Sequence, residues 1–235
     1  AALASPELSC AEAPYDTAPL SDLMATVQPV LAMFPQFDPR ISGKIELCLA
    51  DHLIAERGYF EVETNRVVLD ASLPIAATQA VFVHEMRHAR QVEYGTCPST
   101  ALSMHEYARA VFAIEADASV TSLVVAWALK ESGDAAMWEA LVAWPRHSDV
   151  AEAFSDEMAE SGDVAAAASR AFDQWHARQE RTDAYYVTAC MDYLDQTERD
   201  HSLGRYQALD PGFFDALCVL PDRTRYDCGR RPGSE

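Results

Sequence analysis

The chain has 235 residues, of which 49% are apolar and 23% charged, so it can bury a substantial core and general disorder is excluded. Its 18 Lys and Arg residues against 37 Asp and Glu residues leave a formal charge of −19. Such a surface repels phosphate backbones and anionic lipid headgroups, so we expect neither nucleic acid nor a membrane surface as a partner.

The first residues and the cysteines favour an exported protein, periplasmic or extracellular. Residues 1–6, Ala-Ala-Leu-Ala-Ser-Pro, are typical of the small-residue end of a secretory signal peptide cut after an A-x-A pattern. The six cysteines include no C-x-x-C pair, which favours up to three disulfides over a thiolate zinc cluster. Cys218 and Cys228 flank a segment that is typical of a loop, so we expect a disulfide between them. The alternative is six reduced thiols in a cytosolic protein.

The first third of the chain predicts an arm, one helix and a small sheet. Residues 1–20 contain three prolines and little periodicity, which indicates an extended arm tied down through Cys10. A helix is expected from Ser21, as N-cap, to about Met33, with a kink at Pro29. Alternation from residue 44 and a turn at residues 64–65 predict a small antiparallel sheet that includes a hairpin and ends near residue 70.

The sequence predicts that most of the remaining chain is helical. Helices are expected over residues 72–94, closed by Gly95, and from residue 99 or 100 to about 130. Further helical stretches are expected at about 135–144, 149–160, 163–180 and 183–197, with a loop-like tail from Pro211. No apolar run approaches the length of about 18 residues that a membrane-spanning helix needs, so we expect no membrane insertion. The simplest organisation is a single, mostly helical α+β domain over residues 1–235: an arm at 1–20, the sheet and two long helices at 44–130, and a helical part at 135–235.

The first long helix contains the pattern His-Glu-x-x-His at residues 84–88. At about 100° per residue, His84 and His88 project from one helix face and can share a metal ion. Glu85 points elsewhere and is suited to act as general base on a water at that metal. The predicted amphipathicity leaves Gln79, Arg87 and Arg90 toward solvent.

A catalytic zinc needs a third protein ligand, and the second long helix offers Glu115. Glu115 falls on the apolar stripe of that helix, whereas Asp117 lies on a face that can remain in water. A carboxylate on an apolar face costs several kcal/mol unless it is paired or binds a cation, which favours Glu115 as the ligand. The alternative is that Glu115 pairs with a buried arginine.

The motif His84-Glu85-x-x-His88, followed on a second helix by Glu115-Ala-Asp-Ala118, resembles a gluzincin zinc metallopeptidase of the thermolysin-like group. More narrowly, it is similar to small metallopeptidase-like domains of exported bacterial proteins. The resemblance covers about residues 58–125. It implies Zn²⁺ held by two His and one Glu, the motif Glu as general base, a peptide bond as target, and a strand within residues 59–69 that pairs with extended substrate.

The sequence departs from the family pattern in two places. The acidic residue that orients a ligating His in these enzymes lies four positions after the third ligand, where this chain has Ser119, so Asp117 or another carboxylate must serve. The side chain that stabilises the oxyanion has no motif here, and the candidates are Tyr185, Tyr186 and His201.

Taken together, these observations predict an exported, zinc-dependent peptidase that acts on peptide or protein substrates. A non-catalytic binding or scaffolding protein that keeps the zincin-like fold is the main alternative. An accidental motif in a disulfide-linked helical domain is the third.

Overall fold

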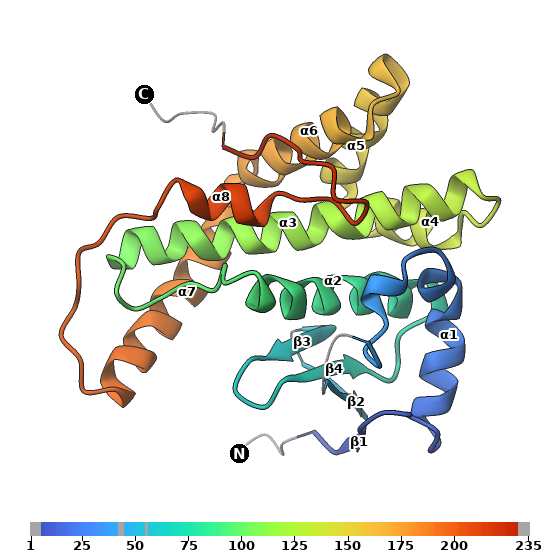
Figure 1. Cartoon of the computed structure of the whole chain (residues 1–235), viewed down its shortest axis with the longest axis horizontal. Helices are drawn as coiled ribbons and strands as arrows, with labels where there is room; N and C mark the ends of the chain where they lie inside the picture. The colour runs from blue at the N-terminus through green and yellow to red at the C-terminus, as the bar shows by residue number, and fades with distance from the viewer. Residues whose placement is uncertain (1–5, 42–44, 55, 230–235) are drawn as a thin grey trace. The chain divides into compact units, whose positions relative to one another are not determined.

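The computed structural model describes residues 6–41, 45–54 and 56–229, so most of the small-residue segment at the start of the chain lies outside the described residues. It is a mostly helical α+β structure, as the sequence predicts (Figure 1). The elements in chain order are β1 (Leu8–Ala11), α1 (Leu20–Met33), the short 3₁₀ helix η1 (Pro35–Phe37), β2 (Glu46–Ala50), β3 (Gly58–Glu61), β4 (Arg66–Asp70), α2 (Ile75–Glu93), α3 (Met104–Glu131), α4 (Ala136–Ala143), α5 (Ser148–Ser161), α6 (Val164–Ala177), α7 (Gln179–Arg199) and α8 (Gly212–Leu217).

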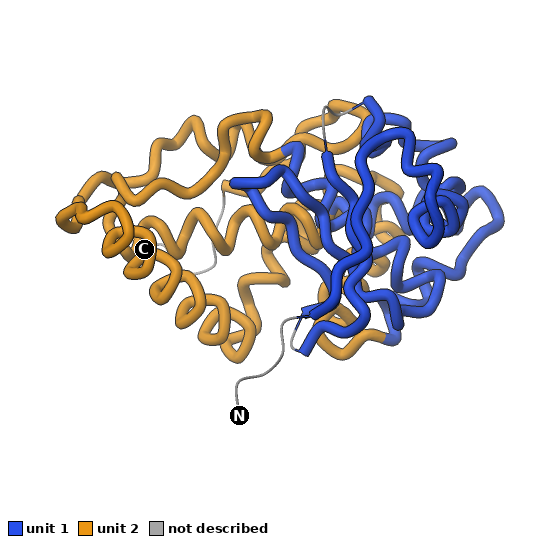
Figure 2. The backbone as a smooth tube through the Cα atoms, turned by 90° about the horizontal axis from the view of Figure 1, so that it is seen from below, with its two compact units in different colours: residues 1–90, 121–143 blue, residues 91–120, 144–235 orange. Residues whose placement is uncertain are grey.

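The chain forms two compact units, coloured separately in Figure 2. Unit 1 comprises residues 1–90 and 121–143, and unit 2 comprises residues 91–120 and 144–235. Helices α2 and α3 each run without interruption through a boundary between these ranges. Whether the two units form the single domain expected from the sequence stays a prediction.

Unit 1 contains a four-stranded sheet of order β1-β2-β4-β3. The outer pairs β1–β2 and β3–β4 are antiparallel, but the central pair β2–β4 is parallel, with Cys48 opposite Val68. The prediction of an antiparallel sheet is thus wrong for its centre. The reason lies in β4, whose run Val67–Leu69 is fully buried and carries no polar alternation, as is typical of a strand covered on both faces. Strand β3, whose residues are half-exposed, takes the edge.

The N-terminal arm is tied to this sheet. Its strand β1 adds an edge to β2, and the Cys10–Cys48 disulfide joins the two. The buried Tyr15 hydroxyl donates to the Ile45 carbonyl at 2.6 Å, and burial raises the pKa of Tyr15 to about 12. The arm is therefore part of the sheet, which the proline-rich sequence alone did not indicate.

Each predicted helix is present, as α1 to α7, with differences at the helix ends. Helix α1 continues through Pro29, and it begins at Leu20 without a capping side chain, so Ser21 is not its N-cap. Residues 99–102 form a turn, and α3 begins only at Met104. The tail predicted as a loop contains the short helix α8. Gly95 follows α2 at φ +72°, a left-handed conformation that ends a helix and favours glycine.

Helix α2 packs against the sheet at a glycine. A Cβ atom placed on Gly58, the first residue of β3, would lie 2.6 Å from Cγ1 of Val81 and 2.9 Å from the Val68 carbonyl oxygen. Only a residue without a side chain permits this approach between the strand and the helix. Because Val81 lies one turn before His84, Gly58 also sets where the histidine-bearing part of α2 runs.

We therefore expect Gly58→Ala to lower the free energy of unfolding by about 1–3 kcal/mol, the usual cost of overpacking a core. The matched control is Gly204→Ala, whose Cβ would meet nothing within 4 Å. Urea denaturation of the two variants measures the difference. Equal stability of both variants would contradict the close packing of β3 on α2.

Unit 2 is helical. Helices α5 and α6 lie side by side (Figure 1), and α3 and α7 share a cluster of buried side chains. In that cluster the Tyr107 and Tyr193 rings meet edge to face at 5.4 Å, and the Tyr193 hydroxyl donates to the Leu102 carbonyl at 3.1 Å. Arg181 in the first turn of α7 donates to the Asp149 carboxylate of α5 at 2.6 Å and to the Trp175 carbonyl of α6 at 2.8 Å, so it links α7 to both helices.

By length and composition, one helix among the described residues could cross a membrane, namely α3. The prediction that the chain has no apolar stretch long enough to span a membrane is therefore wrong by this criterion. Of the most apolar window of α3, 72% is buried inside the protein, which is the pattern of a core helix.

Two disulfides are present, Cys10–Cys48 and Cys218–Cys228. The pairing predicted for Cys218 and Cys228 is confirmed. Cys97 and Cys190 are free thiols, so the described chain has two bridges where up to three were expected. Two disulfides indicate folding in an oxidising environment.

Candidate metal centre

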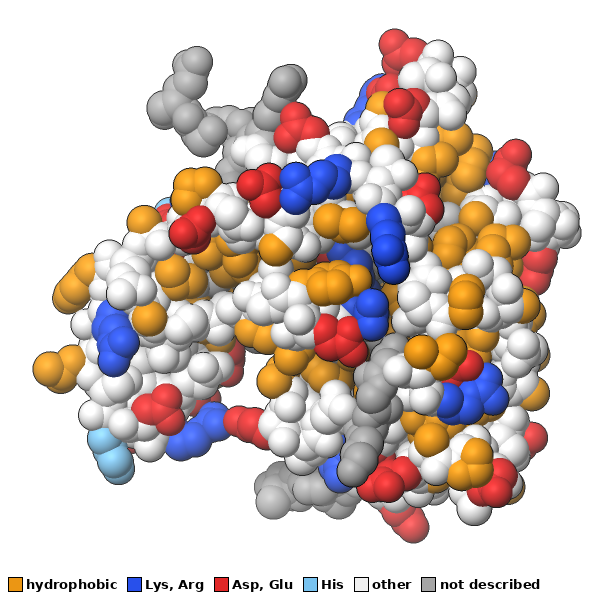
Figure 3. All heavy atoms as spheres, in the orientation of Figure 1, with side chains coloured by type: hydrophobic (Ala, Val, Ile, Leu, Met, Phe, Trp, Pro, Cys, Tyr) orange, Lys and Arg blue, Asp and Glu red, His pale blue; other side chains and the backbone are white. Residues whose placement is uncertain are grey.

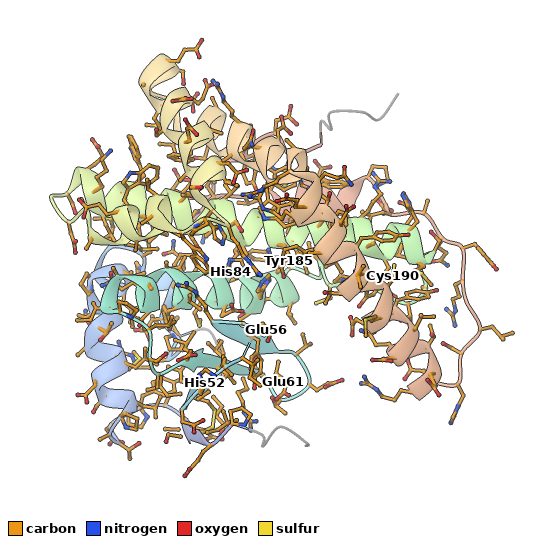
Figure 4. All side chains as sticks on the ribbon, turned by 180° about the vertical axis from the view of Figure 1, so that it is seen from behind. His52, Glu56, Glu61, His84, Tyr185 and Cys190 are labelled. Atoms are coloured by element: carbon orange, nitrogen blue, oxygen red, sulfur yellow. A yellow bond between two sulfur atoms is a disulfide. The ribbon has the colours of Figure 1, made fainter. Side chains whose placement is uncertain are left out.

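The two motif histidines lie on the same face of α2. The ring centroids of His84 and His88 are 4.8 Å apart and their planes meet at 82°. Both side chains are half-buried, and His84 is labelled in Figure 4. The spacing of one helical turn thus places two imidazoles together at a partly shielded position, as the motif predicts.

Glu85, the residue after His84, is buried, with 6% of its surface exposed, although its side chain is a carboxyl group. Its apolar neighbours on α2, Phe82, Met86 and Ala89, are also buried. A carboxylate in such surroundings is shielded from bulk water, which strengthens its electrostatic interactions.

The prediction that Gln79 and Arg87 face solvent is wrong. Both are buried, and the Gln79 side-chain amide donates to the Thr26 carbonyl of α1 at 2.9 Å. Arg90 is half-buried. The amphipathic pattern failed here because α2 is covered on more sides than one apolar face implies, so its polar side chains bond to neighbouring elements.

The ligand atoms of His84, His88 and Glu115 all lie within 4.8 Å of one another. Glu115 is half-buried in α3, and the residues around it on that helix, Ala113, Ala116 and Ala118, are fully buried. Two imidazoles and one carboxylate are the protein ligands typical of a catalytic zinc site, which keeps a further position for water or substrate. The donor set therefore fits a metal ion of this kind.

Two sets of hydrogen bonds fix the antiparallel register of α2 and α3. Within unit 1, the Ser122 hydroxyl donates to the Ala80 carbonyl at 3.3 Å. Within unit 2, the Gln91 side-chain amide donates to the Ile114 carbonyl at 2.9 Å and to the Asp117 carboxylate at 2.7 Å. The motif histidines lie between Ala80 and Gln91 on one helix, and Glu115 lies between Ile114 and Ser122 on the other.

Asp117 is fully buried, which corrects the prediction that it remains in water. One carboxylate oxygen accepts from Gln91 and the other accepts from the Tyr226 hydroxyl, each at 2.7 Å. The helical pattern around Asp117 did not reveal these partners, because Tyr226 is 109 residues away in the chain. Gln91 and Tyr226 are thus the residues that the sequence reasoning missed.

The candidates for oxyanion stabilisation all lie in unit 2. The Tyr185 ring, labelled in Figure 4, contacts Trp175 at a centroid distance of 5.1 Å. Tyr186 is exposed, and a hydrogen bond with Cys190 raises its pKa. His201 is exposed at the end of α7. Their role stays a prediction, as does the orienting role considered for Asp117.

A second group of metal-binding side-chain types consists of Cys10, Glu46 and Cys48. Its two sulfur atoms form the disulfide between β1 and β2, so they are not available as thiolate ligands in this structure. Its donor set therefore does not fit a metal ion as well as the group of His84, His88 and Glu115 does.

Unit 2 also contains a hollow of about 820 Å³ beside α8. Its lining includes both cysteines of the Cys218–Cys228 disulfide and Tyr226, with Arg109 and Asp215. Acidic and basic side chains lie close together on the surface over α8 and the loop after it (Figure 3). The lining contains no histidine, so the metal-binding donor set lies elsewhere.

Comparison with known proteins gives one family. Residues 4–228 match the model of a family described as "Putative metallopeptidase family (DUF6782)". No curated protein and no solved structure matches the chain.

Proposed function

Since the chain belongs to this metallopeptidase family, we propose that it is a zinc-dependent peptidase of the gluzincin type, with His84, His88 and Glu115 as zinc ligands and Glu85 as general base. The observation that carries the proposal is the convergence of the three ligand side chains within 4.8 Å. Family membership supports a metal-dependent hydrolase, and the donor set favours Zn²⁺.

The chemistry follows from the residues. When bound, zinc polarises the carbonyl of the scissile peptide bond and makes a water molecule more acidic. The Glu85 carboxylate accepts a proton from that water as its oxygen bonds to the carbonyl carbon. The C–N bond then breaks, and Glu85 returns the proton to the departing amine nitrogen. His84, His88 and Glu115 hold the metal throughout.

An extended peptide or protein segment is the proposed substrate. Strand β3 is an edge of the described sheet, and its residues are half-exposed. An edge strand offers backbone N–H and C=O groups to a peptide in extended conformation, which supports the substrate-pairing role expected for this segment. The protein is proposed to act in the periplasm or outside the cell, which its two disulfides support.

Metal content and peptide hydrolysis test the proposal together. We expect elemental analysis of the purified protein to give about one equivalent of zinc, and a mixed peptide library to be cleaved. Removal of the metal with a chelator should stop cleavage, and added zinc should restore it. Bound zinc without cleavage of any library peptide would instead favour a non-catalytic binding or scaffolding protein, and absence of bound metal would overturn the metal centre itself.

A further inference from the structure

The C-terminal loop between Cys218 and Cys228 is a stapled hairpin. The disulfide joins its ends, and Val219 forms an antiparallel bridge with Arg225 inside it. The Tyr226 backbone N–H donates to the Cys218 carbonyl at 3.2 Å. The next residue, Asp227, donates its N–H to the Ser169 hydroxyl of α6 at 2.9 Å. Tyr226 is therefore held from both sides, and we call residues 218–228 the stapled loop.

The Tyr226 side chain points from the stapled loop into the protein. It is buried, and its ring lies 6.0 Å from the Phe172 ring of α6, centroid to centroid. Its hydroxyl donates to Oδ1 of Asp117 at 2.7 Å. The loop thus supplies a fixed hydrogen-bond donor to a carboxylate that has no access to water.

Asp117 connects Tyr226 by hydrogen bonds to both helices of the candidate metal centre. Its other oxygen accepts from Gln91 of α2, and the same Gln91 amide nitrogen also donates to the Ile114 carbonyl of α3. Gln91 is three residues after His88, and Asp117 is two residues after Glu115. The chain of hydrogen bonds therefore fixes α2 beside one ligand and α3 beside another.

We infer that Tyr226 is a positioning residue for the metal centre, and that the Cys218–Cys228 disulfide holds it in place. Without the Tyr226 hydroxyl, Oδ1 of the buried Asp117 loses a donor, and a buried polar atom that loses its partner is costly enough to shift its surroundings. Such a shift alters the register of α2 against α3 at Gln91. Metal ligands must be held to within about 0.5 Å, so the affinity for zinc falls.

This inference rests on the proposed function, and the test separates the two. We expect Tyr226→Phe to weaken zinc binding by roughly 10-fold, at the lower end of what removal of a ligand-orienting group causes. The affinity is measured by chelator competition, and unfolding is measured on the metal-free protein. The matched control is Tyr193→Phe, which also removes one buried hydroxyl of unit 2, here the donor to the Leu102 carbonyl. Both variants should lose similar stability, but Tyr193→Phe should keep the wild-type affinity for zinc.

A second pair of variants tests the staple. Replacing Cys218 and Cys228 together by Ser should weaken zinc binding about as much as Tyr226→Phe, roughly 10-fold. The same replacement of Cys10 and Cys48, the disulfide of the sheet, should leave the affinity unchanged. If Tyr226→Phe binds zinc as tightly as Tyr193→Phe, the positioning role is overturned and the proposed function stands. If the wild-type protein binds no zinc, the proposed function and this inference both fail.

Discussion

Glu85→Gln is expected to lower the rate of peptide hydrolysis by about 10²–10⁴-fold while the protein keeps its zinc. The substitution preserves the size of the side chain and its place on α2, but an amide cannot accept the proton that water must lose. Since the side chain is buried, solvent cannot easily substitute for it as a base. The measurement is kcat on a peptide selected from the library, together with elemental analysis of the same preparation.

The control for this variant is Glu93→Gln, which makes the same chemical change at an exposed position two turns further along α2. It should keep wild-type activity. Loss of zinc from Glu85→Gln would identify Glu85 as a ligand and contradict the division of roles between it and the histidines. Unchanged activity with zinc still bound would show that another group accepts the proton.

His88→Ala should remove tight metal binding. Structural zinc sites with four ligands bind with about 10–16 kcal/mol, so the loss of one ligand costs about 3 kcal/mol or more, which weakens affinity by at least about a hundred-fold. Activity at trace zinc should disappear with the metal. Chelator competition measures the affinity, and circular dichroism verifies that the helices persist.

His105→Ala is the matched control, because the His105 side chain is 73% exposed on the first turn of α3. It removes an imidazole from the chain without touching the proposed ligands, so zinc should bind as in the wild type. Equal zinc affinity of His88→Ala and His105→Ala would remove His88 from the ligand set.

The features that the sequence predicted are those encoded by local spacing. The positions of His84 and His88 four residues apart suffice to place two imidazoles together, because the helix fixes their geometry. The apolar stripe singled out Glu115, whose ligand atom lies within 4.8 Å of those of the histidines. The Cys218–Cys228 pairing could also be predicted, because the two cysteines are only 10 residues apart and flank a single loop.

The features that sequence reasoning missed depend on interactions between distant parts of the chain. Asp117 was expected in water because the pattern of a single helix does not show that Tyr226 covers it. Gln79 and Arg87 were expected at the surface because amphipathicity assumes one buried face, whereas α2 is buried on several. The parallel pairing of β2 with β4 was recoverable in part, since the uninterrupted run Val67–Leu69 is typical of a central strand.

The strand order β1-β2-β4-β3 bears on how the polypeptide assembles. The hairpin of β3 and β4 closes over a short turn, so its pairing is local and fast. The parallel pairing of β2 with β4 closes a loop that contains all of β3, so it costs more chain entropy than closing the β3–β4 hairpin. Helix α2 rests on this sheet through Val81 and Gly58. Since Gly58 belongs to the local hairpin, the contact that supports the histidine-bearing helix does not have to wait for the longer-range pairing of β2 with β4.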